Sequence, residues 1–282
     1  MSVSTRAKDV EGSTLHEERF HRVQSFRAVM TDKSVDVAVV QSMEDMYWLT
    51  GFNTPGAPRC QALVVTQYDL LISSRTLEVT NALLHSTLSA SAGHAEGEDP
   101  VAHLARNILQ FNPATVGLQS ETERTTPADS QALLALLTAK KGKSECSIVD
   151  ISGCIRSMRS TKSRRELSLM RRAGELCAAS VHAALKQTAE NVHCTESDVA
   201  AHALLGARRG GGDFAAYPPF ICAGVTAPLG HYAASQVQVP IRNGENVFYE
   251  LAGCYQRYHV AVMRTAHVGT ELPPALQVGD ER

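Results

Sequence analysis

The chain has 282 residues, 44% of them hydrophobic and 20% charged, and a formal net charge of −2 at pH 7. This is the composition of a globular protein long enough for two domains with separate cores, and its nearly neutral charge gives no electrostatic reason to expect nucleic acid or a membrane surface as a partner. The seven cysteines are scattered without a C-x-x-C pair, and the amino-terminal residues lack the apolar core of a signal peptide. We therefore expect reduced thiols and a cytoplasmic protein.

The first half of the chain alternates short apolar runs with helix signatures. Residues 1–13 are polar and are predicted to form a disordered tail. Asp99-Pro100 and Thr126-Pro127 each combine a capping residue with a proline, which is typical of a helix start. Apolar runs predict strands at residues 35–40, 61–65, 70–73, 115–118 and 148–151, and a short helix at 43–52 that buries Met46, Trp48 and Leu49. Strands alternating with helices predict an α/β domain with a mixed sheet over residues 14–155.

A second domain is predicted over residues 156–282, after a basic segment at 156–172 that serves as linker and helix start. Ser163 and Glu166 form a capping box in this segment, and Thr195 with Asp198 caps the following helix. That helix stops at a glycine triplet, which no strand precedes and no Lys-Ser/Thr follows, so we do not expect a phosphate-binding loop.

The stretch from residue 217 to residue 269 combines a Gly/Pro-rich loop, a lone histidine (His231) and a predicted β-hairpin. In the first arm of the hairpin, alternation places Glu250 on the opposite face from Tyr249 and Leu251. An acidic side chain in an apolar strand costs several kcal/mol if it is buried without a partner, so Glu250 needs a partner or a function. The turn is expected at Gly253, and His259, Ala261 and Met263 are expected to share one face of the second arm.

The order of these features resembles the pita-bread superfamily of creatinase, Xaa-Pro dipeptidase and methionine aminopeptidase. A histidine after a loop is followed by a strand with one acidic residue, a hairpin, and a second strand that ends in Arg264-Thr265. Residues 43–52 (MEDMYWLTGF) and residues 159–167 (RSTKSRREL) are similar to the motifs of this superfamily in the amino-terminal domain and at the domain boundary. The resemblance implies an α/β creatinase-like domain followed by an α+β pita-bread domain.

The hairpin departs from the metallopeptidase branch of that superfamily. Members of the branch carry an aspartate on each arm, and the two aspartates bridge a pair of divalent metals. Here Glu250 stands at the first position and Ala261 at the second, and a methyl group coordinates nothing. We therefore expect no cofactor, with binuclear Mn, Co or Zn required only under a metallopeptidase alternative. The amino-acid sequence of the hairpin is most similar to that of ectoine hydrolase-like members, which work without the metal pair.

Three residues of the second domain are candidates for catalysis. By resemblance, His231 matches the histidine that transfers a proton, and an unperturbed pKa near 6.5 suits that task; the alternative is an exposed loop histidine. Glu250 could contact the reacting group, or it could be a structural carboxylate that pairs with Arg264 or His259. His259 could fill the space left by the missing aspartate, or it could serve packing alone.

Arg59 is the candidate for substrate binding. It follows Gly51 by eight residues, and in creatinase an arginine at similar spacing reaches the neighbouring subunit and binds the substrate carboxylate. A guanidinium fork suits that role. The alternative is an ordinary exposed loop arginine. The substrate-binding interpretation implies a homodimer.

These observations predict metal-independent hydrolysis of a C–N bond in a small carboxylate-bearing substrate, ectoine- or creatine-like. The alternatives are an Xaa-Pro dipeptidase-type metallopeptidase and a catalytically inactive interaction protein or fragment. Neither nucleic acid nor a membrane is expected as a partner. Full pita-bread domains continue past this hairpin to a histidine and two glutamates, so the second domain is expected to be truncated and the purified chain to be poorly soluble or to dimerise abnormally.

Overall fold

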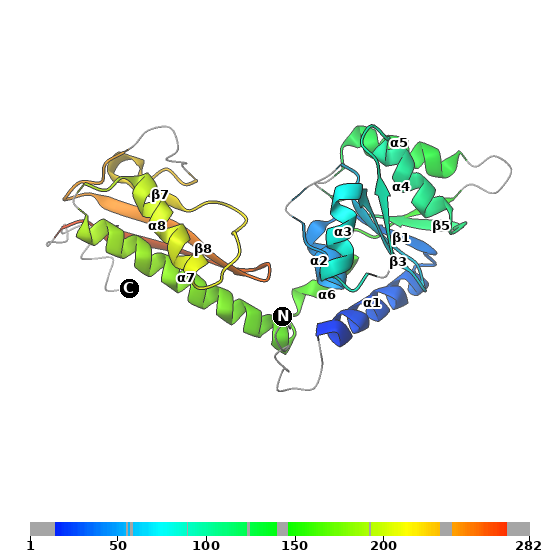
Figure 1. Ribbon diagram of the computed structural model, residues 1–282, viewed down its shortest axis with the longest axis horizontal. Helices are drawn as coiled ribbons and strands as arrows, with labels where there is room; N and C mark the ends of the chain where they lie inside the picture. Colours follow the sequence, from blue (N-terminus) through cyan, green and yellow to red (C-terminus); the bar gives the residue numbers. More distant parts are fainter. Residues whose placement is uncertain are drawn as a thin grey trace, which may run out of the picture. The chain divides into compact units, whose positions relative to one another are not determined.

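The computed structural model describes residues 15–54, 56, 59–88, 90–122, 125–139, 146–191, 193–231 and 239–269. These residues form two units that divide between Thr161 and Lys162, and Figure 1 shows both. The predicted tail at 1–13 lies outside the described residues, and so does Gly142, where the sequence predicts the end of the helix that starts at Thr126-Pro127.

The first unit is built on a six-stranded mixed sheet in the order β4-β3-β2-β1-β5-β6. The pairs β1–β2 and β2–β3 are antiparallel, and the other three pairs are parallel. The sheet confirms the predicted α/β class. The strands are β1 (Val37–Val40), β2 (Ala62–Val65), β3 (Leu70–Arg75), β4 (Ala90–His94), β5 (Thr115–Leu118) and β6 (Ser147–Asp150).

Apolar side chains cover both faces of this sheet. Ala38 and Val40 belong to one cluster of buried residues, and the alternate residues Val37 and Val39 belong to another. The first cluster draws on α1, α2 and α6, and the second draws on α4 and α5, which explains why β1 is apolar at every position. The helices are α1 (Leu15–Asp32), α2 (Met43–Thr50), α3 (Thr76–His85), α4 (Pro100–Leu109), α5 (Pro127–Thr138) and α6 (Cys154–Ser160).

The helix starts of this unit follow their capping residues. The carboxylate of Asp99 accepts a hydrogen bond from the Val101 N–H (3.1 Å), and the hydroxyl of Thr126 accepts one from the Asp129 N–H (3.1 Å). As predicted, Met46, Trp48 and Leu49 of α2 are buried. Local sequence therefore determines where these helices begin.

Three elements of the first unit were not predicted. The residue before α3 makes no side-chain capping bond, and β4 consists of small and polar residues without apolar alternation. Helix α6 occupies part of the segment predicted as a linker, and its Arg159 Nη1 lies 2.6 Å from Oδ1 of the buried Asp45. Contacts with residues distant in the sequence therefore stabilise these elements, and local sequence patterns do not predict them.

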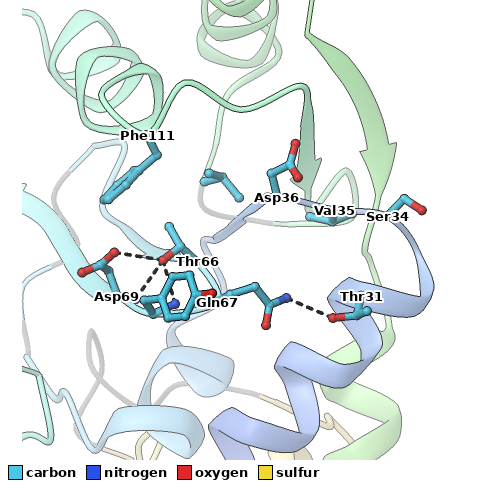
Figure 2. A pocket seen from close by; sticks show the side chains of 10 residues that line it. Thr31, Ser34, Val35, Asp36, Thr66, Gln67, Asp69 and Phe111 are labelled. Carbon is cyan, nitrogen blue, oxygen red and sulfur yellow. Dashed lines mark hydrogen bonds between the residues drawn. The ribbon is translucent and has the colours of Figure 1, made fainter.

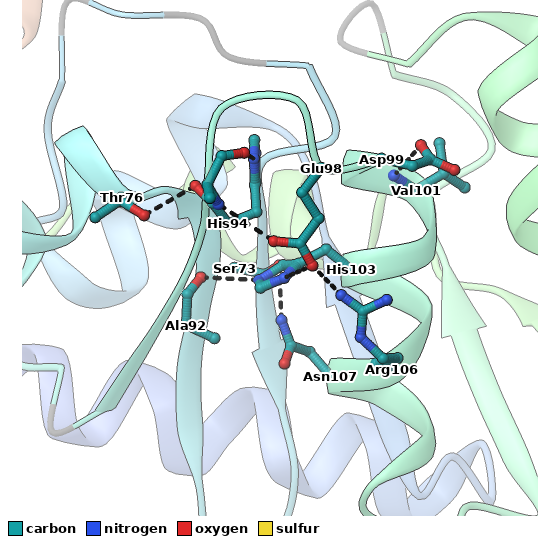
Figure 3. A network of polar contacts seen from close by, with 11 residues as sticks. Ser73, Thr76, Ala92, His94, Glu98, Asp99, Val101, His103, Arg106 and Asn107 are labelled. Atoms are coloured by element: carbon teal, nitrogen blue, oxygen red, sulfur yellow. Dashed lines mark hydrogen bonds and ion pairs between the residues drawn. The ribbon is translucent and has the colours of Figure 1, made fainter.

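A polar network joins the end of β4 to the start of α4, as Figure 3 shows. The two ring nitrogens of His103 lie 3.3 Å from Oε1 of Glu98 and 3.2 Å from the Ala92 carbonyl oxygen. Partial burial tends to raise the pKa of Glu98, but hydrogen bonds from Ala95 and His103 and the charge of Arg106 lower it overall. The network holds the β4–α4 corner in place.

The second unit packs two helices on one face of a three-stranded antiparallel sheet, β7-β8-β9. Tyr249 and Leu251 of β8 belong to a buried cluster that includes Ala184 of α7 and Val199 of α8. The elements are α7 (Arg164–Glu190), α8 (Glu196–Arg209), β7 (Phe220–Ala223), a 3-10 turn η1 (Gly224–Thr226), β8 (Asn246–Tyr255) and β9 (Tyr258–His267). Both predicted capping boxes are present, at Ser163–Glu166 and at Thr195–Asp198.

The hairpin turn does not lie at Gly253, contrary to the prediction. Strands β8 and β9 pair from Asn246–His267 to Tyr255–Tyr258, and the turn is made by Gln256 and Arg257 with φ of 46° and 65°. Gly253 lies inside β8 where α7 crosses the sheet, and a Cβ there would stand 2.1 Å from the Ala173 carbonyl oxygen. This glycine permits a close helix–sheet approach and has no role in the turn.

The described part of the chain contains no helix that is both long and apolar enough to cross a bilayer.

Candidate functional site

Glu250 lies in the middle of β8 and is 5% exposed. Its neighbours in the sheet register are Phe220 of β7 and Met263 of β9. Because Tyr249 and Leu251 pack among the helices, alternation turns Glu250 to the sheet face that α7 and α8 do not cover. The carboxylate is therefore held on a rigid strand.

His231 meets this carboxylate from the loop that follows η1. Its Nε2 lies 3.6 Å from Oε2 of Glu250, and its ring centroid lies 5.3 Å from that of Phe220. The side chain of His231 is 75% exposed, and its backbone is in the left-handed region with φ of 57°. The structure thus brings together two of the three predicted catalytic candidates, which lie 19 positions apart in the sequence.

Tyr217 is a third member of this cluster, and the sequence analysis assigned it no role. Its ring stacks on that of Phe220, the register neighbour of Glu250, at 5.7 Å with an interplanar angle of 23°. Burial, followed by the charge and hydrogen bonding of Glu250, raises the pKa of Tyr217. The phenol therefore lies close enough to sense the charge of the carboxylate. In the sequence, Tyr217 is marked only as an aromatic residue before the Pro218-Pro219 pair. This local pattern does not predict proximity to Glu250, 33 positions away.

His259 shares the sheet face of Glu250 but lies farther along the hairpin. It pairs in register with Cys254, four positions from Glu250, which is about 13 Å along a strand. Its Nδ1 lies 2.9 Å from the Arg257 carbonyl oxygen and 3.9 Å from the sulfur of Cys254. The structure does not bring His259 to the His231–Glu250 pair.

The predicted structural partners of Glu250 lie elsewhere. Arg264 pairs in register with Tyr249 and donates from Nη1 to the Met263 carbonyl oxygen (2.8 Å). Among the described residues, the imidazole of His231 lies within ion-pair distance of Glu250, and the charge of Glu250 also acts on Tyr217.

Arg59 belongs to the first unit and binds a carboxylate there. Its Nε lies 2.9 Å from Oδ1 and 3.0 Å from Oδ2 of Asp129, and its Nη2 also binds Oδ1. The hydrogen bond from Arg59 lowers the pKa of Asp129, although burial opposes the shift. The side chain of Asp129 is 3% exposed and that of Arg59 59% exposed, so the arginine covers a buried carboxylate and keeps an outer edge at the surface.

Replacing Arg59 with alanine is expected to lower the melting temperature of the first unit by a few degrees at neutral pH, because a buried carboxylate loses its partner. The pKa of Asp129 is lowered from 3.8, so the stabilisation is present above that pH and is lost as the pH falls below it. The difference between wild type and variant should therefore shrink under acid. Calorimetry between pH 3 and 7 tests this expectation, and a difference that grows under acid would contradict it.

The hairpin of the second unit lacks the ligands of the metal pair that the metallopeptidase branch uses. Such a centre needs bridging oxygen ligands from both arms of the hairpin. Here Glu250 stands opposite Met263, and Ala261 stands opposite Ala252. In the part of the chain that the structure describes, no three His, Cys, Asp or Glu side chains gather as a metal site would require. This donor set does not fit a two-metal centre.

The first unit contains a cavity of about 460 Å³ between the end of α1, the β2–β3 turn and the start of β1, which Figure 2 shows from close by. None of the predicted site residues lines it, and the catalytic candidates belong to the other unit. Its walls are formed by Thr31, Ser34, Val35, Asp36, Val37, Thr66, Gln67, Tyr68, Asp69 and Phe111.

Comparison with known proteins covers both units. Residues 22–161 match the Creatinase/Prolidase N-terminal domain, and residues 168–278 match Metallopeptidase family M24. An ectoine hydrolase from Halomonas elongata is 24% identical over 279 residues, which are 92% of this chain and 67% of that protein. An Xaa-Pro dipeptidase from Pyrococcus horikoshii is 25% identical over 250 residues, which are 88% of this chain and 64% of that protein.

Solved structures show the same fold. An X-Pro aminopeptidase from Thermotoga maritima superimposes with a TM-score of 0.76 at 14% identity, over 92% of this chain and 68% of that one. The prolidase from Pyrococcus horikoshii gives a TM-score of 0.71 at 20% identity, over 89% and 66%. The chain thus spans about two thirds of the length of these relatives. With a creatinase-type domain followed by an M24-type domain, it belongs to the creatinase/M24 pita-bread superfamily of hydrolases.

Proposed function

We propose that this protein hydrolyses a C–N bond in a small carboxylate-bearing molecule, ectoine- or creatine-like, and that it does so without a metal pair. The observation that carries the proposal is the buried carboxylate of Glu250, 3.6 Å from the imidazole of the exposed His231. Support also comes from the second arm of the hairpin, where Met263 faces Glu250 and Ala261 faces Ala252, and neither residue offers an oxygen ligand.

In this reaction His231 serves as general base and then as general acid. The imidazole takes a proton from the attacking water as the oxygen bonds to carbon, and it returns the proton to the nitrogen as the C–N bond breaks. Glu250 orients the imidazole and stabilises its positive charge, as a buried carboxylate does for a catalytic histidine. Tyr217 holds the carboxylate in place through its hydroxyl group.

We further propose that the protein forms a homodimer, in which Arg59 of a second copy binds the substrate carboxylate. Its Nε and Nη2 bind Asp129, while no hydrogen bond of Nη1 to a described residue is recorded. Asp129 thereby orients the guanidinium and leaves an edge that can bind an anion. We also propose a cytoplasmic location for the protein.

The test is hydrolysis of ectoine, creatine and an Xaa-Pro dipeptide, each with and without a chelator. We expect turnover that the chelator does not change and that Glu250→Gln lowers about 100-fold or more. The matched control is Glu175→Gln, since Glu175 is an exposed carboxylate of α7 that pairs with Arg172.

Other outcomes favour the alternatives. Metal-dependent cleavage of the Xaa-Pro dipeptide would identify a dipeptidase, the activity named for some relatives. A folded protein without turnover of any of the three would favour an interaction protein.

A further inference from the structure

A second carboxylate of this unit, Glu196, is completely buried although it begins helix α8. Its Oε1 accepts hydrogen bonds from the Ala223 N–H (2.7 Å) and the Thr226 hydroxyl (2.6 Å). Both partners lie where β7 passes into η1, 27 and 30 positions away in the sequence. Glu196 therefore ties the start of α8 to the end of β7.

The other oxygen of this carboxylate, Oε2, is buried and has no hydrogen-bond partner among the described residues. Burying an unpartnered carboxylate oxygen is unfavourable, and such groups are rare in folded proteins. The positive end of the α8 dipole offsets part of this cost. Stability alone therefore does not explain a glutamate at this position. The groups that bind its Oε1 atom suggest its role.

The residues that Glu196 holds form the base of the loop that carries His231. The Thr226 carbonyl oxygen accepts a hydrogen bond from the Leu229 N–H (2.8 Å), and only Gly230 separates Leu229 from His231. The sulfur of Cys222 also lies 3.4 Å from the Leu229 carbonyl oxygen. A continuous set of bonds thus leads from α8 through Thr226 and Leu229 to the histidine.

The position of His231 depends on this loop more than on its own side-chain contacts. The side chain is 75% exposed, and its recorded contacts are with Glu250 and Phe220. A left-handed backbone at a non-glycine residue is unfavourable and persists only where surrounding bonds impose it. The anchored loop supplies those bonds.

We propose that Glu196 is a positioning residue of the site: through Thr226 it sets the loop that presents the imidazole of His231 to Glu250. This inference rests on the proposed function, because it concerns the placement of the same histidine.

The test removes the hydrogen bond between Thr226 and Glu196 from either side. Thr226→Val keeps the shape of the side chain and removes the hydroxyl, and Glu196→Ala removes the acceptor. Glu196→Gln and Thr226→Ser keep the acceptor and the donor, respectively. The structural control is Asp198→Ala, which removes the exposed capping carboxylate of the same helix (Thr195 N to Asp198 Oδ2, 2.9 Å) but leaves Glu196 intact.

Two readouts are required. The first is the nuclear Overhauser effect between the rings of His231 and Phe220, which needs no substrate and is assigned by comparison with His231→Gln. The second is kcat/KM for hydrolysis. Thr226→Val and Glu196→Ala should lose the ring-to-ring effect and at least tenfold in kcat/KM, while Glu196→Gln, Thr226→Ser and Asp198→Ala should retain both.

A ring-to-ring effect that persists in Thr226→Val and Glu196→Ala would overturn the inference. An equal loss in Asp198→Ala would also overturn it, since the effect would then reflect the general stability of α8. If the wild-type protein hydrolyses none of the substrates, the proposed function fails, and the ring-to-ring effect alone still decides whether Glu196 positions His231.

Discussion

Replacing His231 with alanine is expected to lower kcat for hydrolysis by about 10²–10⁴-fold, the range in which a positioned general acid–base contributes. The imidazole is the group placed 3.6 Å from Glu250 that can take and return a proton near neutral pH. Because the side chain is 75% exposed, its removal should leave the melting temperature unchanged. Steady-state kinetics and calorimetry on the same preparations measure both quantities.

The matched control for this variant is His259→Ala. His259 lies on the same face of the hairpin but pairs with Cys254, about 13 Å along the strand from Glu250. We expect its kcat to stay within about twofold of wild type, the scale of a substitution that touches no reacting group. Unchanged turnover in His231→Ala would remove His231 from the mechanism, and a large loss in His259→Ala would restore the catalytic role that the sequence suggested for it.

Replacing Gly253 with alanine is expected to destabilise the second unit. The new Cβ would stand 2.1 Å from the Ala173 carbonyl oxygen and 2.4 Å from the Cys177 nitrogen. Both are backbone atoms of α7, so the helix itself must move away from the sheet. Overpacking of this kind costs about 1–3 kcal/mol and occasionally more, and chemical denaturation measures it.

Gly174→Ala is the matched control for this prediction. Gly174 follows Ala173 in the same helix, and a Cβ there would meet no other atom within 4 Å. Alanine in a helix interior is favoured over glycine by about 0.5–1 kcal/mol, so this variant should be more stable than wild type. Equal stability of Gly253→Ala and wild type would show that α7 can shift at no cost.

Local sequence was enough for the features whose partners lie within a few positions. The boxes at Ser163–Glu166 and Thr195–Asp198 each satisfy backbone N–H groups three residues away, so four letters of sequence describe the whole interaction. Most of the other elements followed from such signals and from apolar alternation, but α3, β4 and α6 did not. Glu250 was recognisable because a carboxylate inside an apolar strand needs a partner.

The turn of the hairpin shows where local reasoning failed. Glycine is the usual turn residue, and Gly253 was chosen for that reason. The structure instead places Gln256 and Arg257 in the turn and Gly253 beneath α7. A close approach of two backbones depends on a residue 80 positions earlier, and no local pattern records it.

The sequence by itself determined the class of both domains, the position of most helices and strands, and three separate catalytic candidates in His231, Glu250 and His259. Only the tertiary structure decided which of these candidates lie together. In the structure, Tyr217 lies near the carboxylate of Glu250 and His259 lies away from it. Arg59 binds Asp129. Strand register and loop anchoring set these distances, and both depend on contacts between residues far apart in the chain.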